Sequence, residues 1–251
     1  MTTHPPLAPS VVAGSLAGIP RLLRTDPVLG ALLGAADATV AVPEAAQAVV
    51  AAALAAFTQR TPLLVVTPTG LDAERLVDDL GCLLESQVGA AGEKGTCVGA
   101  LGGAVTILPA WETLPFERVS PEIETMGRRL AVLHALTQPS DGAVPSPRVI
   151  VGPVRAILQR LAPLDAAAPT VIGRGQQIES EVLLHELAAR GYRREHQVEH
   201  RGEFAVRGGI VDVFPSTSDT PVRIDLWGDE VDRLTTFAVS DQRSSADIDS
   251  V

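Results

Sequence analysis

The alternation of apolar runs along residues 40 to 162 constrains the fold more than any single motif does. Short continuous apolar runs, which are typical of buried strands, alternate there with longer stretches of helical periodicity. Because consecutive parallel strands are usually joined by a helix, this order predicts a parallel sheet with helices on its faces, an α/β architecture. The predicted strands span 62–68, 104–110 and 148–151, and the predicted helices span 44–58, 71–84 and 153–161.

A further helix is predicted to begin near Ser120 and Pro121. Proline fits the first helical position, and Glu122 and Glu124 place negative charge at the positive end of the helix dipole. Apolar residues then recur at three- and four-residue spacing, which predicts one buried face. These residues are Ile123, Met126, Leu130, Leu133 and Leu136.

The pattern changes after residue 162. The stretch 161–170 is rich in Ala and Pro, which favours a domain boundary. Beyond it, one predicted helix at 179–190 precedes a series of short alternating strands, which indicates a small α+β unit. We therefore predict a first α/β domain over residues 1–165 and a small α+β domain over residues 166–251.

Composition excludes a membrane protein. No run approaches the roughly 20 apolar residues of a membrane span, and the start, MTTHPPLAPS, lacks the basic region of a secretory signal. The two cysteines, Cys82 and Cys97, do not have a metal-binding spacing. We expect a cytoplasmic protein with reduced thiols.

Charge and lysine usage exclude two kinds of phosphate binding. The formal net charge of −10 argues against binding of a nucleic-acid backbone, which needs a concentrated positive field. The only lysine, Lys94, lies in GAAGEKGT between Glu93 and Gly95. A phosphate loop needs Gly, Lys and Ser or Thr in succession between a strand and a helix. We therefore predict no phosphate loop, no nucleotide cofactor and no catalytic residue.

The segment HQVEH (196–200) matches the inverted zinc-peptidase motif H-x-x-E-H. Zinc binding would require His196 and His200 one helical turn apart. Residues 193–201 carry a single apolar residue, Val198, so a helix here has no face to bury. As a strand, the segment would hold the two histidines about 13 Å apart. We predict strand structure and no metal site.

An exposed aromatic and a neighbouring arginine mark a candidate binding face in the second domain. In PVRIDLWGDEV, Val222, Ile224 and Leu226 alternate with Arg223, Asp225 and Trp227, which places Arg223 and Trp227 on one strand face. In EFAVRGG, Arg207 precedes a glycine bend. Trp and Arg are the residue types most enriched in binding hot spots.

Two plainer readings of this region remain open. Trp227 covers a neighbouring helix in one of them, with the arginines paired to Asp225, Asp229 or Glu230 as solvated surface. The acidic residues Asp225, Asp229, Glu230 and Asp232 resemble a divalent-metal site, although Gly228 followed by Asp229 favours a charged turn.

Two long segments carry a family resemblance. LPAWETLPFERVSPEIETMGRRLAVLHAL (108–136) and RGEFAVRGGIVDVFPSTSDTPVRIDLWGDEVDRLTTFAVSDQRS (201–244) resemble the N-terminal, UvrB-like region of the bacterial transcription-repair coupling factors (Mfd). The order of motifs matches along nearly the whole chain, including GPVRAILQRLAP. UvrB itself keeps a phosphate loop after its first strand, where this chain has VVTPTGLDAERL (65–76).

The resemblance implies a degenerate RecA/helicase-like sheet domain that lacks a phosphate loop, followed by a UvrA-binding domain. It also implies that ATP, magnesium, DNA and RNA polymerase are bound by other domains of the parent, an ATP-dependent translocase acting in transcription-coupled nucleotide excision repair. The family's UvrA-contacting residues, two arginines and an aromatic, fall on Arg207, Arg223 and Trp227. Some relatives carry Phe at the last position.

Two other functions are weighed against UvrA binding. The first is an enzyme, either a nucleotide-binding UvrB-type helicase fragment or a zinc hydrolase. The second is a regulatory domain that masks the motor of the parent through contacts with its other domains. The masking role is compatible with UvrA binding.

Overall fold

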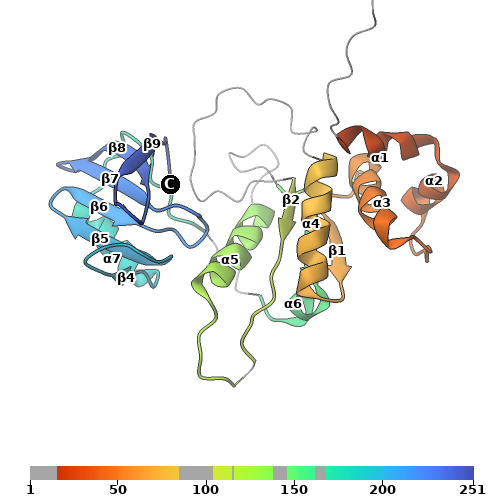
Figure 1. Cartoon of the computed structure of the whole chain (residues 1–251), viewed down its shortest axis with the longest axis horizontal. Helices are drawn as coiled ribbons and strands as arrows, with labels where there is room; N and C mark the ends of the chain where they lie inside the picture. Colours follow the sequence, from red (N-terminus) through yellow and green to blue (C-terminus); the bar gives the residue numbers. More distant parts are fainter. Residues whose placement is uncertain (1–15, 85–103, 115, 138–145, 162–167) are drawn as a thin grey trace, which may run out of the picture.

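The computed structural model describes residues 16–84, 104–114, 116–137, 146–161 and 168–251. They form two modules, one built on a parallel sheet and one on a larger mixed sheet (Figure 1). The predicted boundary between residues 165 and 166 lies outside the described residues and stays a prediction.

The sheet of the first module has three parallel strands, as predicted. They are β1 (Leu63–Thr67), β2 (Val105–Ile107) and β3 (Val149–Pro153), in the order β1-β3-β2. Val151 of β3 pairs with Val65 of β1 and with Ile107 of β2. The chain therefore makes the helical crossovers that a parallel sheet requires.

Helices cover both faces of this sheet. On one face, α3 (Glu44–Phe57) and α4 (Gly70–Leu84) share a core with Val149 and Val151. On the other face, α5 (Ile123–Thr137) and α6 (Val154–Leu158) pack around Ile150. The small Ala side chains buried along α3 let it lie close to α4.

Four short N-terminal elements were missed by the sequence analysis. They are η1 (Leu16–Gly18), α1 (Ile19–Leu22), η2 (Leu23–Thr25) and α2 (Pro27–Gly34). Asp26 caps α2, because its side chain accepts hydrogen bonds from the backbone N–H groups of Val28 and Leu29. The α1 and α2 helices contact α3.

Two burial predictions for the first module are wrong. The strand β1 is not fully buried, since Leu64 and Val66 are 51% and 49% exposed at one edge of the sheet. On α5, Leu130 and Leu136 of the predicted buried face are exposed. The helix α6 also ends at Leu158, earlier than predicted.

The buried face of α5 differs because this helix contacts two neighbours. Val132 packs on the first sheet, whereas Gly127 contacts the second module. Arg129 is 2% exposed, its guanidinium lies 4.5 Å above the centre of the Trp111 ring, and it donates to the Pro109 carbonyl at 2.5 Å. Burial lowers the pKa of Arg129.

The second module is the α+β unit that the sequence predicted. Its sheet runs β4-β5-β6-β7-β8-β9, and β5 to β9 form antiparallel neighbours. The helix α7 (Ser180–Ala189) packs Leu183 and Leu187 against the core of one face. The strands are β4 (Arg193–Arg194), β5 (Glu203–Arg207), β6 (Ile210–Val213), β7 (Val222–Trp227), β8 (Glu230–Phe237) and β9 (Ser244–Asp247).

The zinc-like segment HQVEH is neither helix nor strand. Residues 196–200 form an irregular loop, so the strand prediction for them is wrong. Val198 is fully buried and anchors the loop on the sheet. The Glu203 carboxylate then accepts hydrogen bonds from the backbone N–H groups of Glu199 and His200, at 3.0 and 2.9 Å. The loop is therefore shaped by an acidic residue of the following strand.

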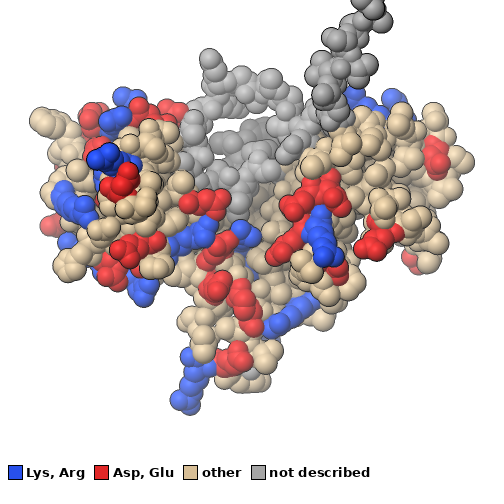
Figure 2. Space-filling view, in the orientation of Figure 1, with Lys and Arg blue, Asp and Glu red and all other residues tan. Residues whose placement is uncertain are grey.

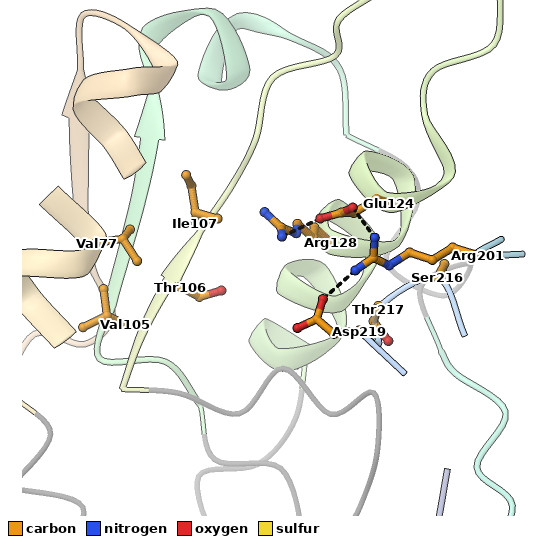
Figure 3. Close-up of a pocket in the computed structure, with 10 residues that line it drawn as sticks. All are labelled: Val77, Val105, Thr106, Ile107, Glu124, Arg128, Arg201, Ser216, Thr217 and Asp219. Carbon is orange, nitrogen blue, oxygen red and sulfur yellow. Dashed lines mark hydrogen bonds and ion pairs between the residues drawn. The ribbon is translucent and has the colours of Figure 1, made fainter. Parts of the chain in front are cut away.

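The two modules meet along α5. Arg201 of the second module donates to Glu124 of α5 at 2.6 Å and to Asp219 at 2.5 Å (Figure 3). Arg128, one turn after Glu124, joins the same group of charges. These residues line a cavity of about 200 Å³ between β2 and the second module. The ion pair between Arg201 and Glu124 therefore joins the second module to α5.

Candidate partner-binding face

Alternation along β7 determines which residues form the candidate binding face. Val222 and Ile224 are fully buried against the α7 side, whereas Trp227 is exposed. The prediction that Arg223 and Trp227 lie on the face opposite to this core is confirmed by that pattern.

Strand register places Arg207 on the same face. Arg207 pairs with Ile210, Ile210 pairs with Asp225, and Asp225 pairs with Arg233. These four residues form a row across β5 to β8, which we call the outer row. Directly paired residues on adjacent strands share a face, so Arg207 lies with Arg223 and Trp227.

A second row lies one pleat further along the strands. It contains Ala205, Asp212, Arg223 and Thr235, and we call it the inner row. The 196–200 loop and the 238–243 loop cover the inner row. Val198 of the first loop and Val239 of the second pack with Ala205 and Phe237. The amide of Gln242 donates to the carbonyls of Val198 and Val239 and joins the loops. The outer row and Trp227 form the more open part of the face.

Arg223 is held inside the inner row. Its Nε and Nη2 donate to the two carboxylate oxygens of Asp212 at 2.7 and 2.9 Å, and its Nη1 donates to the Gln242 carbonyl at 3.2 Å. The guanidinium lies 4.9 Å from the centre of the Phe237 ring. The hydrogen bond that Arg223 donates to the Asp212 carboxylate raises the pKa of Arg223. Only 17% of the side chain is exposed, and its partner is Asp212 rather than the acidic residues named in the solvated-surface reading.

Trp227 is 83% exposed. The idea that it covers a neighbouring helix is therefore wrong. Trp227 ends β7 immediately before the turn at Gly228 and Asp229, where Gly228 adopts a φ of +62° that a side chain would disfavour. The charged turn that the sequence predicted at this point is confirmed. The strand ladder on one side and the tight turn on the other hold the backbone that carries the indole.

The two outer-row arginines make weaker internal contacts than Arg223. Arg207 is exposed and donates one hydrogen bond to the His196 carbonyl at 3.1 Å. Arg233 pairs with Asp247 at 2.7 Å, with 53% and 62% of the two side chains exposed. The sequence analysis missed Arg233, because a bulge in β8 breaks the alternation along VDRLTTF. Val231 and Leu234, three residues apart, are both buried.

The acidic residues near this face are engaged in the turn and the sheet. Glu230 accepts a hydrogen bond from the Gln177 side chain at 3.2 Å, and the backbone carbonyl of Asp229 accepts one from Ile178. Across the described ranges, no group of three or more His, Cys, Asp or Glu residues is arranged to hold a metal ion.

The turn after β1, where a phosphate loop would have to lie, is closed by its own side chains. The Thr69 hydroxyl accepts from the backbone N–H of Asp72 at 3.2 Å and donates to the Asp72 carboxylate at 2.7 Å. An acidic group thus occupies the first turn of α4, where a phosphate would need positive charge. The loop with Lys94 lies outside the described residues.

Comparison with known proteins confirms the resemblance seen in the sequence. Residues 171–251 match the UvrB interaction domain family. The chain is 39% identical to a transcription-repair-coupling factor of Mycobacterium tuberculosis over 93% of its length, and 33% identical to that of Bacillus subtilis over 82%. The Escherichia coli protein of this name is 30% identical over 89% of the chain. The chain spans only 18%, 16% and 17% of these proteins.

No helix in the described part of the chain is long and apolar enough to cross a membrane.

Proposed function

Because this chain is related over most of its length to the transcription-repair-coupling factors, and its second module to the UvrB interaction domain, we propose that the second module binds UvrA. The binding surface is the sheet face that carries Arg207, Arg223 and Trp227. Its role is to recruit UvrA in transcription-coupled nucleotide excision repair.

The single observation that carries this proposal is the exposure of Trp227. A chain with two tryptophans places one of them 83% exposed at the end of a strand, on the same sheet face as the exposed Arg207, within the residues that match the UvrB interaction domain. An indole in water is unfavourable, whereas an indole buried by a partner contributes apolar area at low entropic cost. Arg207 supplies charge-assisted hydrogen bonds at the margin of the same surface.

Arg223 supports this surface from the inner row. Its bonds to Asp212 and Gln242 fix β6, β7 and the 238–243 loop relative to one another. Only 17% of its side chain is exposed. The prediction that UvrA contacts Arg223 directly therefore stays a prediction, and the structural bonds give Arg223 a second reason to be required for binding.

We further propose that this chain catalyses no reaction of its own. Asp72 and Thr69 occupy the helix terminus that a nucleotide phosphate would need. ATP-dependent translocation, and contacts with DNA and RNA polymerase, belong in this proposal to other parts of the parent. A regulatory role of the same face, covered within the parent until UvrA is needed, fits an aromatic residue that is exposed in this chain.

Calorimetric titration of the chain into UvrA from the same organism tests the proposal. We expect saturable binding that Trp227→Ala weakens by thirtyfold or more, since truncating a central aromatic anchor costs about 2 kcal/mol or more. Val182→Ala is the matched control, because Val182 is 50% exposed on α7, on the opposite side of the sheet. Absence of binding by the folded wild-type chain, or equal affinity of all three proteins, contradicts the proposal.

A further inference from the structure

We propose that Arg233 is a further partner-contacting residue, and that the outer row fits a UvrA surface with two carboxylates on either side of an apolar contact. This inference rests on the proposed function and deepens it. It adds a contact residue and states the chemistry of the partner.

The outer row has a fixed order and spacing. Arg207, Ile210, Asp225 and Arg233 are paired in sequence across four neighbouring strands. Neighbouring strands lie about 4.8 Å apart, so the Cα atoms of the two arginines are separated by about 14 Å. The two arginines thus lie at the ends of the row, and the half-buried Ile210 and the carboxylate of Asp225 lie between them.

Arg233 is available to a partner because its internal ion pair is exposed. Arg233 and Asp247 are 53% and 62% exposed, and exposed ion pairs of this kind contribute little to stability. Arg233 can therefore release the Asp247 carboxylate and bind a carboxylate of the partner at little cost in free energy. The Arg223–Asp212 pair differs, because its side chains are 17% and 2% exposed and its geometry is bidentate. Arg207 and Arg233 are the donors that can change partner.

Asp225 determines where a partner can place its negative charge. It lies between Ile210 and Arg233 in the row. A partner carboxylate opposite Asp225 is repelled, whereas one opposite either arginine is attracted. The apolar contact falls on Ile210 and on Trp227, which follows Asp225 by two residues on the same face of β7. The partner therefore needs acidic groups at the two ends and an apolar group between them.

The charge of this face favours a protein over a nucleic acid. Asp225 and Asp247 accompany the two outer-row arginines, so the face has no net excess of positive charge. Acidic and basic side chains are intermixed over the visible surface of the second module (Figure 2). A nucleic-acid backbone requires concentrated positive charge, which a surface of alternating sign does not provide.

The test compares Arg233→Gln, Asp247→Asn and Arg207→Gln in calorimetric titrations of the full chain into UvrA. Arg194→Gln is the matched control, because Arg194 pairs with Phe204 and so lies on the opposite, α7-facing side. We expect Arg233→Gln and Arg207→Gln each to weaken binding about tenfold. Asp247→Asn is expected to strengthen binding about twofold to threefold, because it removes the internal competitor for Arg233.

The outcomes separate this inference from the proposed function. If the wild-type chain binds and Arg207→Gln weakens it while Arg233→Gln matches Arg194→Gln, the inference is wrong and the proposed function stands. If Asp247→Asn weakens binding as much as Arg233→Gln, the ion pair acts structurally and the inference is also wrong. If the folded wild-type chain does not bind UvrA, both are wrong. Thermal unfolding of each variant identifies any loss of fold.

Discussion

Asp212 and Arg223 form a two-pronged ion pair in the centre of the second sheet, with hydrogen bonds of 2.7 and 2.9 Å between the carboxylate and the guanidinium. Asp212 is 1% exposed and lies on β6, directly opposite Arg223 on β7. The pair therefore joins two strands within the candidate binding face. Its position makes stability and the proposed partner binding depend on the same residues.

Removal of one member of this pair is expected to destabilise the second module strongly. Asp212→Ala leaves the Arg223 guanidinium largely buried without its carboxylate, which typically costs about 3–5 kcal/mol. Chemical denaturation monitored by far-UV circular dichroism measures the free energy of unfolding. Arg207→Ala serves as the control and should change it by no more than about 0.5 kcal/mol, because Arg207 is exposed. Equal stability of the two variants would show that the pair contributes nothing.

Glu203 should make the stability of the second module depend on pH. Burial raises the pKa of its carboxyl, but the hydrogen bonds from the Glu199 and His200 N–H groups, with the nearby charges of His200 and Arg193, lower the pKa overall. A lowered folded-state pKa stabilises the protein above the unfolded value of about 4.3, and this contribution is lost as the pH falls through the folded-state pKa.

The substitution Glu203→Gln isolates that contribution. At pH 7 we expect it to reduce the free energy of unfolding by about 1–3 kcal/mol, because hydrogen bonds to a charged acceptor are replaced by weaker ones. The difference from the wild type should shrink below about pH 4, where the carboxyl of Glu203 becomes protonated. Glu195→Gln, at an exposed position nearby, should show no such pH-dependent difference. A difference that stays constant from pH 7 to pH 3 contradicts the assignment.

Sequence patterns predicted the parts of this fold that depend on local periodicity. The alternation in β7 was sufficient to place Arg223 and Trp227 on one face, since neighbouring side chains of a strand point to opposite sides. The helices α3, α4 and α7 were predicted to within a few residues for a similar reason. The resemblance to a known family contributed Arg207 and the partner that we propose.

Features that depend on tertiary partners were not predictable in the same way. The buried face of α5 was assigned from apolar spacing alone, but this helix contacts a second module through Gly127 and buries Arg129 against Trp111. Arg223 was expected to face a partner freely, and nothing local in its sequence indicated that Asp212, eleven residues earlier, binds it. The 196–200 loop is shaped by hydrogen bonds to Glu203, which a pattern of apolar residues does not report.

Nucleotide should not bind at the turn before α4. With the Asp72 carboxylate in the first helical turn and Thr69 bonded to it, we expect ATP and magnesium to leave the thermal unfolding midpoint of the chain unchanged. Binding to the native state would raise the midpoint in a concentration-dependent way. Thr69→Ala is expected to lower stability by about 0.5–2 kcal/mol through loss of the cap, again with no response to nucleotide. A saturable increase with ATP would revive the nucleotide-binding alternative.

The joint between the modules depends on a residue without a side chain. A Cβ at Gly127 would lie 2.6 Å from the Ser216 hydroxyl oxygen and 2.8 Å from its Cβ, closer than side chains normally approach. Gly127→Ala therefore forces α5 away from the second module. Overpacking of this kind typically costs about 1–3 kcal/mol. The shift also strains the Arg201–Glu124 bond that joins the modules.

Combining Gly127→Ala with Ser216→Gly provides the decisive comparison. The double variant removes both close side-chain contacts but leaves the Ser216 carbonyl, which a Cβ would approach to 2.9 Å. We expect partial recovery of the unfolding free energy, because only part of the steric conflict is relieved. Gly81→Ala, at a helical position with open space around it, is the control and should be neutral or stabilising. If Ser216→Gly restores nothing, the Ser216 side chain does not limit residue size at position 127, and its proposed role in the joint is wrong.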